Sequence, residues 1–192
     1  MTPQRIAIKL FVEPDPSAEI DLEPFTPLFH EFIQKASVPG LLVDVADYAH
    51  VPNGPGIILI GHEVDYGIDS VAGRTGLLTV RKRYPESPLA EVLRDTLAKG
   101  FACAKAIEDD GRTGVRFSAA LVELQIFDRL VAPNDAETFE AARSEVEPVF
   151  AEVYDEFSIE RAGDDDARKP ASLVARTTDD AHFSDLLAKL GS

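Results

Sequence analysis

Residues 41–63 read LLVDVADYAHVPNGPGIILIGHE, and this segment decides the fold class. Its two apolar runs, 41–48 and 57–63, are typical of β-strands in length and composition. Between them, Asn53-Gly54 supplies positive φ angles at little cost, and Pro52 and Pro55 stiffen both flanks. The segment therefore predicts a tight reversal that joins two antiparallel strands.

Segments on both sides extend this pattern. Residues 5–12 alternate with a period of two, which indicates a strand. Similar runs predict further strands at 76–83, 115–127, 157–162 and 172–177. Apolar stripes at helical spacing predict helices from Thr26-Pro27 to about Ala36, from Ser87-Pro88 to Asp110, from Asn134 to about Val153, and over 181–190. The predicted order is β-α-β-β-β-α-β-α-β-β-α.

This order mixes hairpins with helical crossovers, so it differs from the regular alternation of a doubly wound parallel sheet. It predicts an α+β fold: a two-layer sandwich in which a mostly antiparallel (mixed) sheet carries helices on one face. No linker is long enough to separate domains, so residues 1–192 are expected to form a single domain.

Three local features carry their own expectations. The segment from Val64 to Thr75 is expected to be a polar turn between strands. Asn134, with Glu137 three residues later, predicts a capping box at a helix start. Pro148 removes an amide donor inside that helix, so we expect a kink or a break into two pieces there.

The composition excludes several partners. The chain has 34 acidic and 19 basic residues, a net charge of -15. Nucleic-acid binding and anionic membrane surfaces both favour basic proteins, so neither partner is expected. The longest aliphatic stretch, residues 57–60, is too short to span a bilayer, and the N-terminus lacks a signal-peptide core. With its single cysteine, Cys103, expected to be buried and inert, the chain is predicted to be cytoplasmic.

The hairpin region holds the densest chemistry, namely Asp47, His50, His62 and Glu63. A reversal centred on Asn53-Gly54 would place Asp44 opposite Glu63 and make Asp47 a diagonal neighbour of His62.

Two functional readings follow from this arrangement. His50, His62 and a carboxylate suit a metal site, while Asp47 alone would orient His62 as a general base, with Glu63 as a further catalytic candidate. The structural alternative is that Asp47 and His62 satisfy loop amides and that His50 caps a turn. A slip of one residue in register would separate Asp47 from His62.

Motifs for common cofactors are missing from the sequence. Gly54-Pro55-Gly56 is followed by Leu59 where a dinucleotide fingerprint needs glycine, and it opens a strand rather than a helix. The Gly-Arg-Thr-Gly segments at 73–76 and 111–114 lack the lysine of a phosphate-binding loop. No nucleophile elbow is present either. The sequence therefore indicates no particular cofactor.

A basic cluster, Arg74, Arg81, Lys82 and Arg83, stands out in this acidic chain. Arginine binds carboxylates and phosphates with two parallel hydrogen bonds, so Arg74, Arg81 and Arg83 are candidate ligand-binding residues, with Tyr48 and Tyr66. The alternative is that these charges protect an exposed edge strand or pair with the surplus acids. On the predicted strand Thr79, Arg81 and Arg83 share one face, which leaves Leu78 and Val80 for the core.

Residues 135–166 form an acidic counterpart, with twelve acidic residues and two arginines. A solvated helix face and loop explain this composition, and a docking surface for a basic partner is the alternative. Asp164-Asp165-Asp166 lacks the ligand spacing of a calcium-binding loop.

The stretch from Val43 to Gly56, continued by Leu59-Ile60-Gly61-His62-Glu63, resembles a family of uncharacterised bacterial proteins of similar length. The similarity extends from the first strand to about Arg83. The resemblance implies a bacterial, cytosolic origin, and it implies no activity, cofactor or catalytic residue.

The sequence leaves three functions open. The leading hypothesis is a binding or accessory module that recognises a small anionic ligand or a protein through residues 44–83. The alternative is an enzyme, a hydrolase or isomerase, that uses Asp47, His50, His62 and Glu63. A third is an assembly protein whose acidic helix is its interface. Homodimerisation is compatible with exposed sheet edges.

Overall fold

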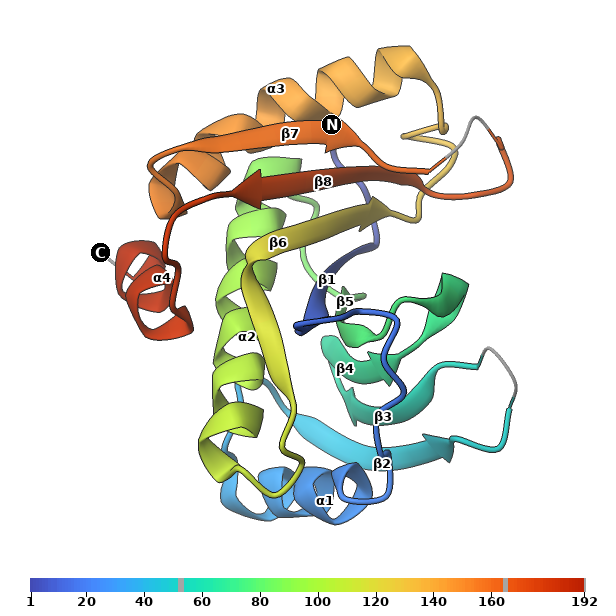
Figure 1. Ribbon diagram of the computed structural model, residues 1–192. Helices are drawn as coiled ribbons and strands as arrows, with labels where there is room; N and C mark the ends of the chain where they lie inside the picture. The colour runs from blue at the N-terminus through green and yellow to red at the C-terminus, as the bar shows by residue number, and fades with distance from the viewer. Residues whose placement is uncertain (52–53, 164–165, 192) are drawn as a thin grey trace.

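In a computed structural model, which describes residues 1–51, 54–163 and 166–191, the chain forms eight strands and four α-helices (Figure 1). Along the chain they are β1 (Ile6–Glu13), α1 (Phe25–Lys35), β2 (Leu42–Tyr48), β3 (Gly56–Gly61), β4 (Val64–Asp69), β5 (Gly76–Arg81), α2 (Leu89–Asp110), β6 (Arg116–Ile126), α3 (Ala136–Val153), β7 (Phe157–Arg161), β8 (Ala171–Thr177) and α4 (Phe183–Leu190). The strands make one sheet in the order β2-β3-β4-β5-β1-β6-β8-β7.

The helices cover one face of this sheet. α1 packs on β2 and β3, α2 on β5, β1 and β6, and α3 on β8 and β7, while α4 packs on α2 and α3. On β1, Ile6, Ile8, Leu10 and Val12 belong to the core beneath the helices. The predicted α+β sandwich is therefore confirmed. All strand pairs of the described chain are antiparallel, so the sheet is not mixed.

β4 is a strand that the sequence analysis assigned to a turn. Val64, Tyr66 and Ile68 are buried on its helix-covered side and alternate with Asp65 and Gly67. Aspartate and glycine have low β propensity, which hides the alternation in the sequence. Burial between β3 and β5 outweighs that propensity.

The two faces of β5 are the reverse of the prediction. Thr79 and Arg81 point toward α2, where Arg81 Nε donates to Asp95 at 2.7 Å. Leu78 lies on the sheet face that carries no helix, directly opposite Lys9 of β1. Thr79 fits under α2 because the helix has Gly100 there: a Cβ at Gly100 would lie 3.1 Å from the Thr79 hydroxyl.

The helices also refine two predicted details. α3 is one continuous helix with Pro148 inside it, so of the expected kink or break into two pieces, the break is wrong. Its N-cap is Asp135, one residue after the predicted Asn134, and the Asp135 side chain accepts the N–H of Thr138. Cys103 is buried, as predicted, and burial raises the pKa of its thiol. None of the helices described is long and apolar enough to cross a membrane.

Candidate functional site

The register of the β2–β3 hairpin differs from the prediction by three positions. Asp44 lies opposite Ile60 rather than Glu63. In the predicted turn, Pro52 and Asn53 lie outside the described residues. Among the described residues of this turn, Gly56 has a positive φ, at 64°, and a Cβ there would lie 2.0 Å from the carbonyl oxygen of Ile68. Only glycine fits at this position, so Gly56 fixes the start of β3.

The histidines of the hairpin lie far apart as a consequence. His50 lies two residues after the end of β2, and His62 follows the last residue of β3, so the two lie at opposite ends of β3. With a rise of about 3.4 Å per residue, they are separated by roughly 20 Å. Two ligands of one metal ion lie within a few ångströms of each other, so His50 and His62 do not share a metal site. No group of three or more His, Cys, Asp or Glu side chains in the described ranges is placed to hold a metal.

The two carboxylates of the proposed catalytic set also lie apart. Asp47 is opposite Ile57, five residues before His62, and its Oδ1 accepts the N–H of Ala49 at 2.9 Å. Glu63 lies at the β3–β4 turn and pairs with Arg81 at 3.1 Å. Asp47 therefore accepts a loop N–H, as the structural alternative to catalysis predicted, and it does not orient His62.

The basic cluster is largely occupied by partners within the chain. Arg74 pairs with Glu123. Arg81 pairs with Glu63 and Asp95, and Lys82 pairs with Asp65. Arg83 donates to the carbonyl oxygen of His62 at 3.3 Å. β5 lies in the middle of the sheet, so the prediction that these charges protect an exposed edge strand is wrong. The other alternative, pairing with acidic residues, holds for three of the four cations.

The two tyrosines proposed as ligand contacts have different surroundings. Tyr66 is fully buried and donates to the carbonyl oxygen of Pro39 at 2.7 Å, so it belongs to the core. Burial raises the pKa of its phenol. Tyr48 is exposed at the end of β2. Of the two, only Tyr48 is accessible to a partner.

A buried ion pair lies on the sheet face opposite the helices. Lys9 Nζ donates to Asp69 at 3.1 Å, and both side chains are at most 6% exposed. Gly76 of β5 is paired with Phe11 of β1 on one side and with Asp69 of β4 on the other. Because Gly76 has no side chain, the Lys9 side chain can cross β5 there to reach Asp69. Desolvation lowers the pKa of Lys9, and the Asp69 charge partly offsets that effect.

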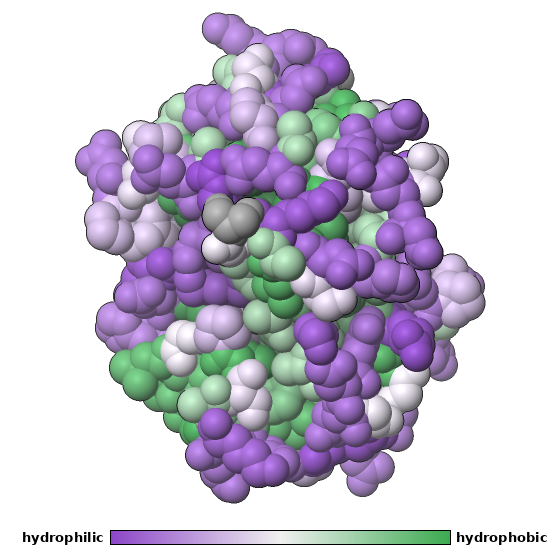
Figure 2. All heavy atoms as spheres, turned by 90° about the vertical axis from the view of Figure 1, so that its left-hand side faces the viewer, coloured by the Kyte–Doolittle hydropathy of each residue, from purple (hydrophilic) through white to green (hydrophobic). Residues whose placement is uncertain are grey.

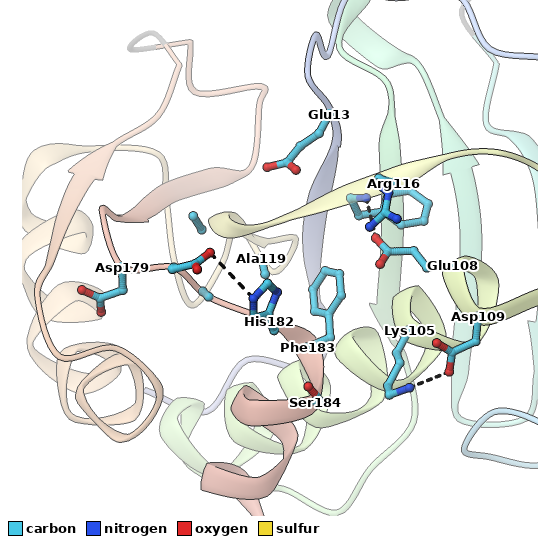
Figure 3. Close-up of a pocket in the computed structure, with 14 residues that line it drawn as sticks. Glu13, Lys105, Glu108, Asp109, Arg116, Ala119, Asp179, His182, Phe183 and Ser184 are labelled. Carbon is cyan, nitrogen blue, oxygen red and sulfur yellow. Dashed lines mark hydrogen bonds and ion pairs between the residues drawn. The ribbon is translucent and has the colours of Figure 1, made fainter. Parts of the chain in front are cut away.

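A concave site lies where β6 and β8 diverge. The β6–β8 ladder covers only Leu121–Ile126, so residues 116–120 have no partner on that side. The chain after β8 turns into α4 instead, and a pocket of about 450 Å³ lies between these segments and the end of α2 (Figure 3). We call it the β6–α4 pocket. Its lining comes from Glu13, Lys105, Glu108, Asp109, residues 116, 117, 119 and 120, and residues 179–184.

The base of the β6–α4 pocket is apolar. Phe117 and Phe183 line it and are almost completely buried, at 3% and 5% exposure. The Phe183 ring packs against Phe101 of α2, with ring centroids 5.6 Å apart. Alanines at 119, 120 and 181 leave the space above the rings open. This base is therefore the part of the pocket that would take an apolar group of a ligand.

The rim of the pocket is acidic. It has five carboxylates, Glu13, Glu108, Asp109, Asp179 and Asp180, against the cations Lys105 and Arg116. Lys105 pairs with Asp109, and Glu108 accepts the N–H of Phe117 at 2.7 Å. The rim therefore has more negative than positive charge.

Two rim carboxylates have opposite environments. Hydrogen bonds from backbone N–H groups, that of Asp155 first, lower the pKa of Asp179. The Glu13 carboxylate, in contrast, has no hydrogen bond or ion pair to another described residue, although Arg116 is its cross-strand partner. Figure 3 shows Glu13 above the pocket and Arg116 on the side of Glu108.

A histidine lies in the middle of the same pocket. His182 precedes the first residue of α4, and its Nε2 lies 3.8 Å from Asp180 Oδ1 (Figure 3). No sequence pattern points to His182, Glu13 or Arg116 as site residues. These residues come from three separate parts of the chain, and none belongs to a recognisable motif, so the sequence holds no signal for them.

No model of a known protein family matches this chain, and none of the curated proteins does. The resemblance to a bacterial family stays a prediction. The function has to be argued from the site itself, because even a familiar architecture hosts many functions.

Proposed function

We propose that the protein is a binding module and that the β6–α4 pocket takes a small organic cation, such as a primary amine on a short apolar body. The observation that carries the proposal is the unpartnered Glu13 carboxylate above an apolar base of Phe117 and Phe183. A volume of about 450 Å³ lies in the range of small-molecule sites.

Charge selects the ligand class. The acidic surplus of the rim favours a cation and disfavours an anion, because the field of several carboxylates adds over a pocket of this size. An organic cation is favoured over a metal ion, since the described chain offers no cluster of three metal-ligating side chains. The amine would donate to Glu13, and its apolar body would cover the two rings.

The functions expected from the hairpin region are less well supported. Three of its four cations already pair with carboxylates, so an anionic ligand would have to displace them. The enzyme alternative needs Asp47, His50, His62 and Glu63 in one cleft, and these residues lie at the two ends of β3.

A matched pair of small molecules tests the proposal. 2-Phenylethylamine and 3-phenylpropionate have similar apolar bodies and opposite charge. In titrations followed by ¹H–¹⁵N correlation spectra, we expect the amine to shift the signals of residues 116–120 and 179–184. Its Kd should be roughly millimolar, as befits a ligand of this size. Equal binding of the carboxylate, or shifts confined to other parts of the chain, would refute the cation site.

Two variants locate the charge. Glu13→Gln should weaken amine binding about five- to tenfold, because it removes the partner of the ammonium group. Glu19→Gln, in the loop that follows β1, is the matched control and should leave the affinity unchanged. Filling the pocket by Ala120→Phe should abolish binding, while the circular dichroism of the protein stays native.

A further inference from the structure

Arg116 is a charged group of the β6–α4 pocket that an amine ligand does not explain. Of the two basic side chains that line the pocket, Lys105 pairs with Asp109. The Arg116 guanidinium is exposed and has no hydrogen bond or ion pair to another described residue. A cation at this position repels an ammonium group, so it would weaken the binding of a simple amine. A ligand that also carries an anionic group would make use of it.

Arg116 and Glu13 lie directly opposite each other in the β1–β6 ladder. Opposite residues of an antiparallel pair have their side chains on the same face, with Cβ atoms about 5 Å apart. The two side chains nevertheless form no ion pair with each other. Figure 3 shows Glu13 above the pocket and Arg116 on the side of Glu108. The pocket thus has an unpartnered carboxylate and an unpartnered guanidinium that start from neighbouring positions.

The free edge of β6 connects these charges with the apolar base of the pocket. Neighbouring residues of a strand point to opposite faces, so Arg116 and Phe117 lie on different sides of β6. Residues 116–120 have no partner strand on the β8 side, and residues of both sides line the same pocket. In the view of Figure 3, the β6 ribbon passes between Glu13 and Phe183. A ligand at this edge can therefore have its charged groups on one side and its apolar part on the other.

The surroundings suit a ligand that has both polar and apolar parts. Figure 2 faces the side of the molecule on which Figure 1 places α4, and hydrophobic atoms in the middle of this view are bordered by hydrophilic atoms. Glu13 and Arg116 are exposed. Phe117 and Phe183, in contrast, are almost completely buried. The charged groups of a ligand can therefore stay in contact with water while its apolar part leaves water, which avoids the cost of burying charges.

We propose that the ligand of the β6–α4 pocket is an α-amino acid with an apolar side chain. This inference rests on the proposed function and makes it more specific, since the ammonium group would still donate to Glu13. The carboxylate would accept two parallel hydrogen bonds from Arg116, the arrangement in which arginine binds carboxylates with the best geometry. Both charged groups of an α-amino acid are attached to one carbon atom. They therefore suit two side chains of opposite charge that start from directly opposite positions of a ladder.

The test compares three ligands that share one apolar body. L-Phenylalanine has both charged groups, whereas 2-phenylethylamine lacks the carboxylate and L-phenylalaninamide has a neutral amide in its place. The ¹H–¹⁵N titrations are made at about pH 6, where α-amino groups are protonated. We expect phenylalanine to bind about fivefold more tightly than either amine, because its carboxylate gains charged hydrogen bonds from Arg116. The amide also represents the N-terminal residue of a peptide, so it distinguishes a free amino acid from a peptide end.

Variants assign the advantage of phenylalanine to one side chain. In Arg116→Gln this fivefold advantage should disappear, while 2-phenylethylamine should bind slightly more tightly because a repelling charge is gone. Arg116→Lys keeps a cation but not the paired donors, so it should retain part of the advantage. Arg143→Gln, on α3 and outside the pocket lining, is the matched control and should change neither affinity. Native circular dichroism of each variant guards against unfolding.

Three results would overturn the inference and leave the amine pocket in place. The first is that phenylalanine binds no more tightly than 2-phenylethylamine, and the second is that Arg116→Gln keeps the advantage of phenylalanine. The third is equal binding of phenylalanine and its amide, because the carboxylate would then not be recognised. If none of the three ligands shifts the signals of residues 116–120 and 179–184, the amine pocket itself is refuted and this inference fails with it.

Discussion

The ion pair between Lys9 and Asp69 gives the sharpest prediction about stability. Lys9→Met keeps most of the side-chain volume but removes the cation. Asp69 would then keep only the N–H of Val71 as a partner, at 2.5 Å, and its charge would remain buried. Removing one member of a buried pair typically costs about 3–5 kcal/mol, because the other charge is left uncompensated. Many domains are stable by only about 5–15 kcal/mol, so the effect is large.

The assay is urea unfolding followed by circular dichroism. Urea is preferred because guanidinium is itself a salt and would screen the pair. The chain has no tryptophan, so fluorescence is a weak probe. With a slope of about 2 kcal/mol per molar urea, the midpoint of Lys9→Met should fall by roughly 2 M. Lys105→Met is the control: Lys105 pairs with Asp109, both side chains are at least 40% exposed, and the loss should stay below about 1 kcal/mol.

A second substitution tests the physical cause. If an uncompensated charge is what destabilises Lys9→Met, then Asp69→Asn in the same chain should restore at least about 1 kcal/mol, since the amide oxygen still accepts from Val71. The reasoning is wrong if the double variant is as unstable as the sum of the two single changes. It is also wrong if Lys9→Met is no less stable than Lys105→Met.

Two other predictions follow from the same sheet. Gly76→Ala would place its Cβ 2.4 Å from the Leu10 carbonyl oxygen, so it should lower the free energy of unfolding by at least about 2 kcal/mol. Gly67→Ala, whose nearest contact is at 3.7 Å, should cost about 1 kcal/mol or less in the same urea assay. At alkaline pH, burial raises the pKa of Tyr66, Tyr84 and Tyr154, so the folded chain holds these protons longer than the unfolded chain and stability falls as the pH rises above about 10. Tyrosinate absorbance at 295 nm should therefore rise together with the loss of circular dichroism, and a smooth rise of all four tyrosines in folded protein would contradict this.

The sequence predicted the architecture because its signals are local. The period of two in residues 6–12 and the apolar stripe of α2 each follow from one segment, and both are found in the core. β4 was missed because Asp65, Gly67 and Asp69 lower its propensity, although Val64, Tyr66 and Ile68 keep the alternation.

The register of the hairpin depends on atoms outside the hairpin. Gly56 lies against the Ile68 carbonyl oxygen of β4, and this contact requires glycine at the position where β3 begins and the turn from β2 ends. The strand that supplies the contact was the one assigned to a turn. Because the predicted register was wrong, it placed Asp47 next to His62, and the predicted catalytic set depended on that placement.

The candidate sites differ in how much the sequence could reveal. The basic cluster can be recognised in the sequence. Its role, however, depends on Glu63, Asp95 and Glu123, which come close to it only in the folded chain. The β6–α4 pocket exists because β8 leaves β6 after six residues, so its walls are an unpaired strand edge and the turn into α4. Such a divergence is a property of the ladder, and no residue pattern encodes it.

Side chains from outside the sheet stabilise the part of β6 that has no partner strand on the β8 side. The N–H of Phe117 bonds to Glu108, and the carbonyl oxygen of Ala119 accepts the buried Tyr154 hydroxyl at 2.6 Å. A side chain of α2 and the tyrosine that follows α3 thus replace two hydrogen bonds that a neighbouring strand would make. This edge stays open without leaving those groups unsatisfied, which is the condition for a stable pocket in the middle of a sheet.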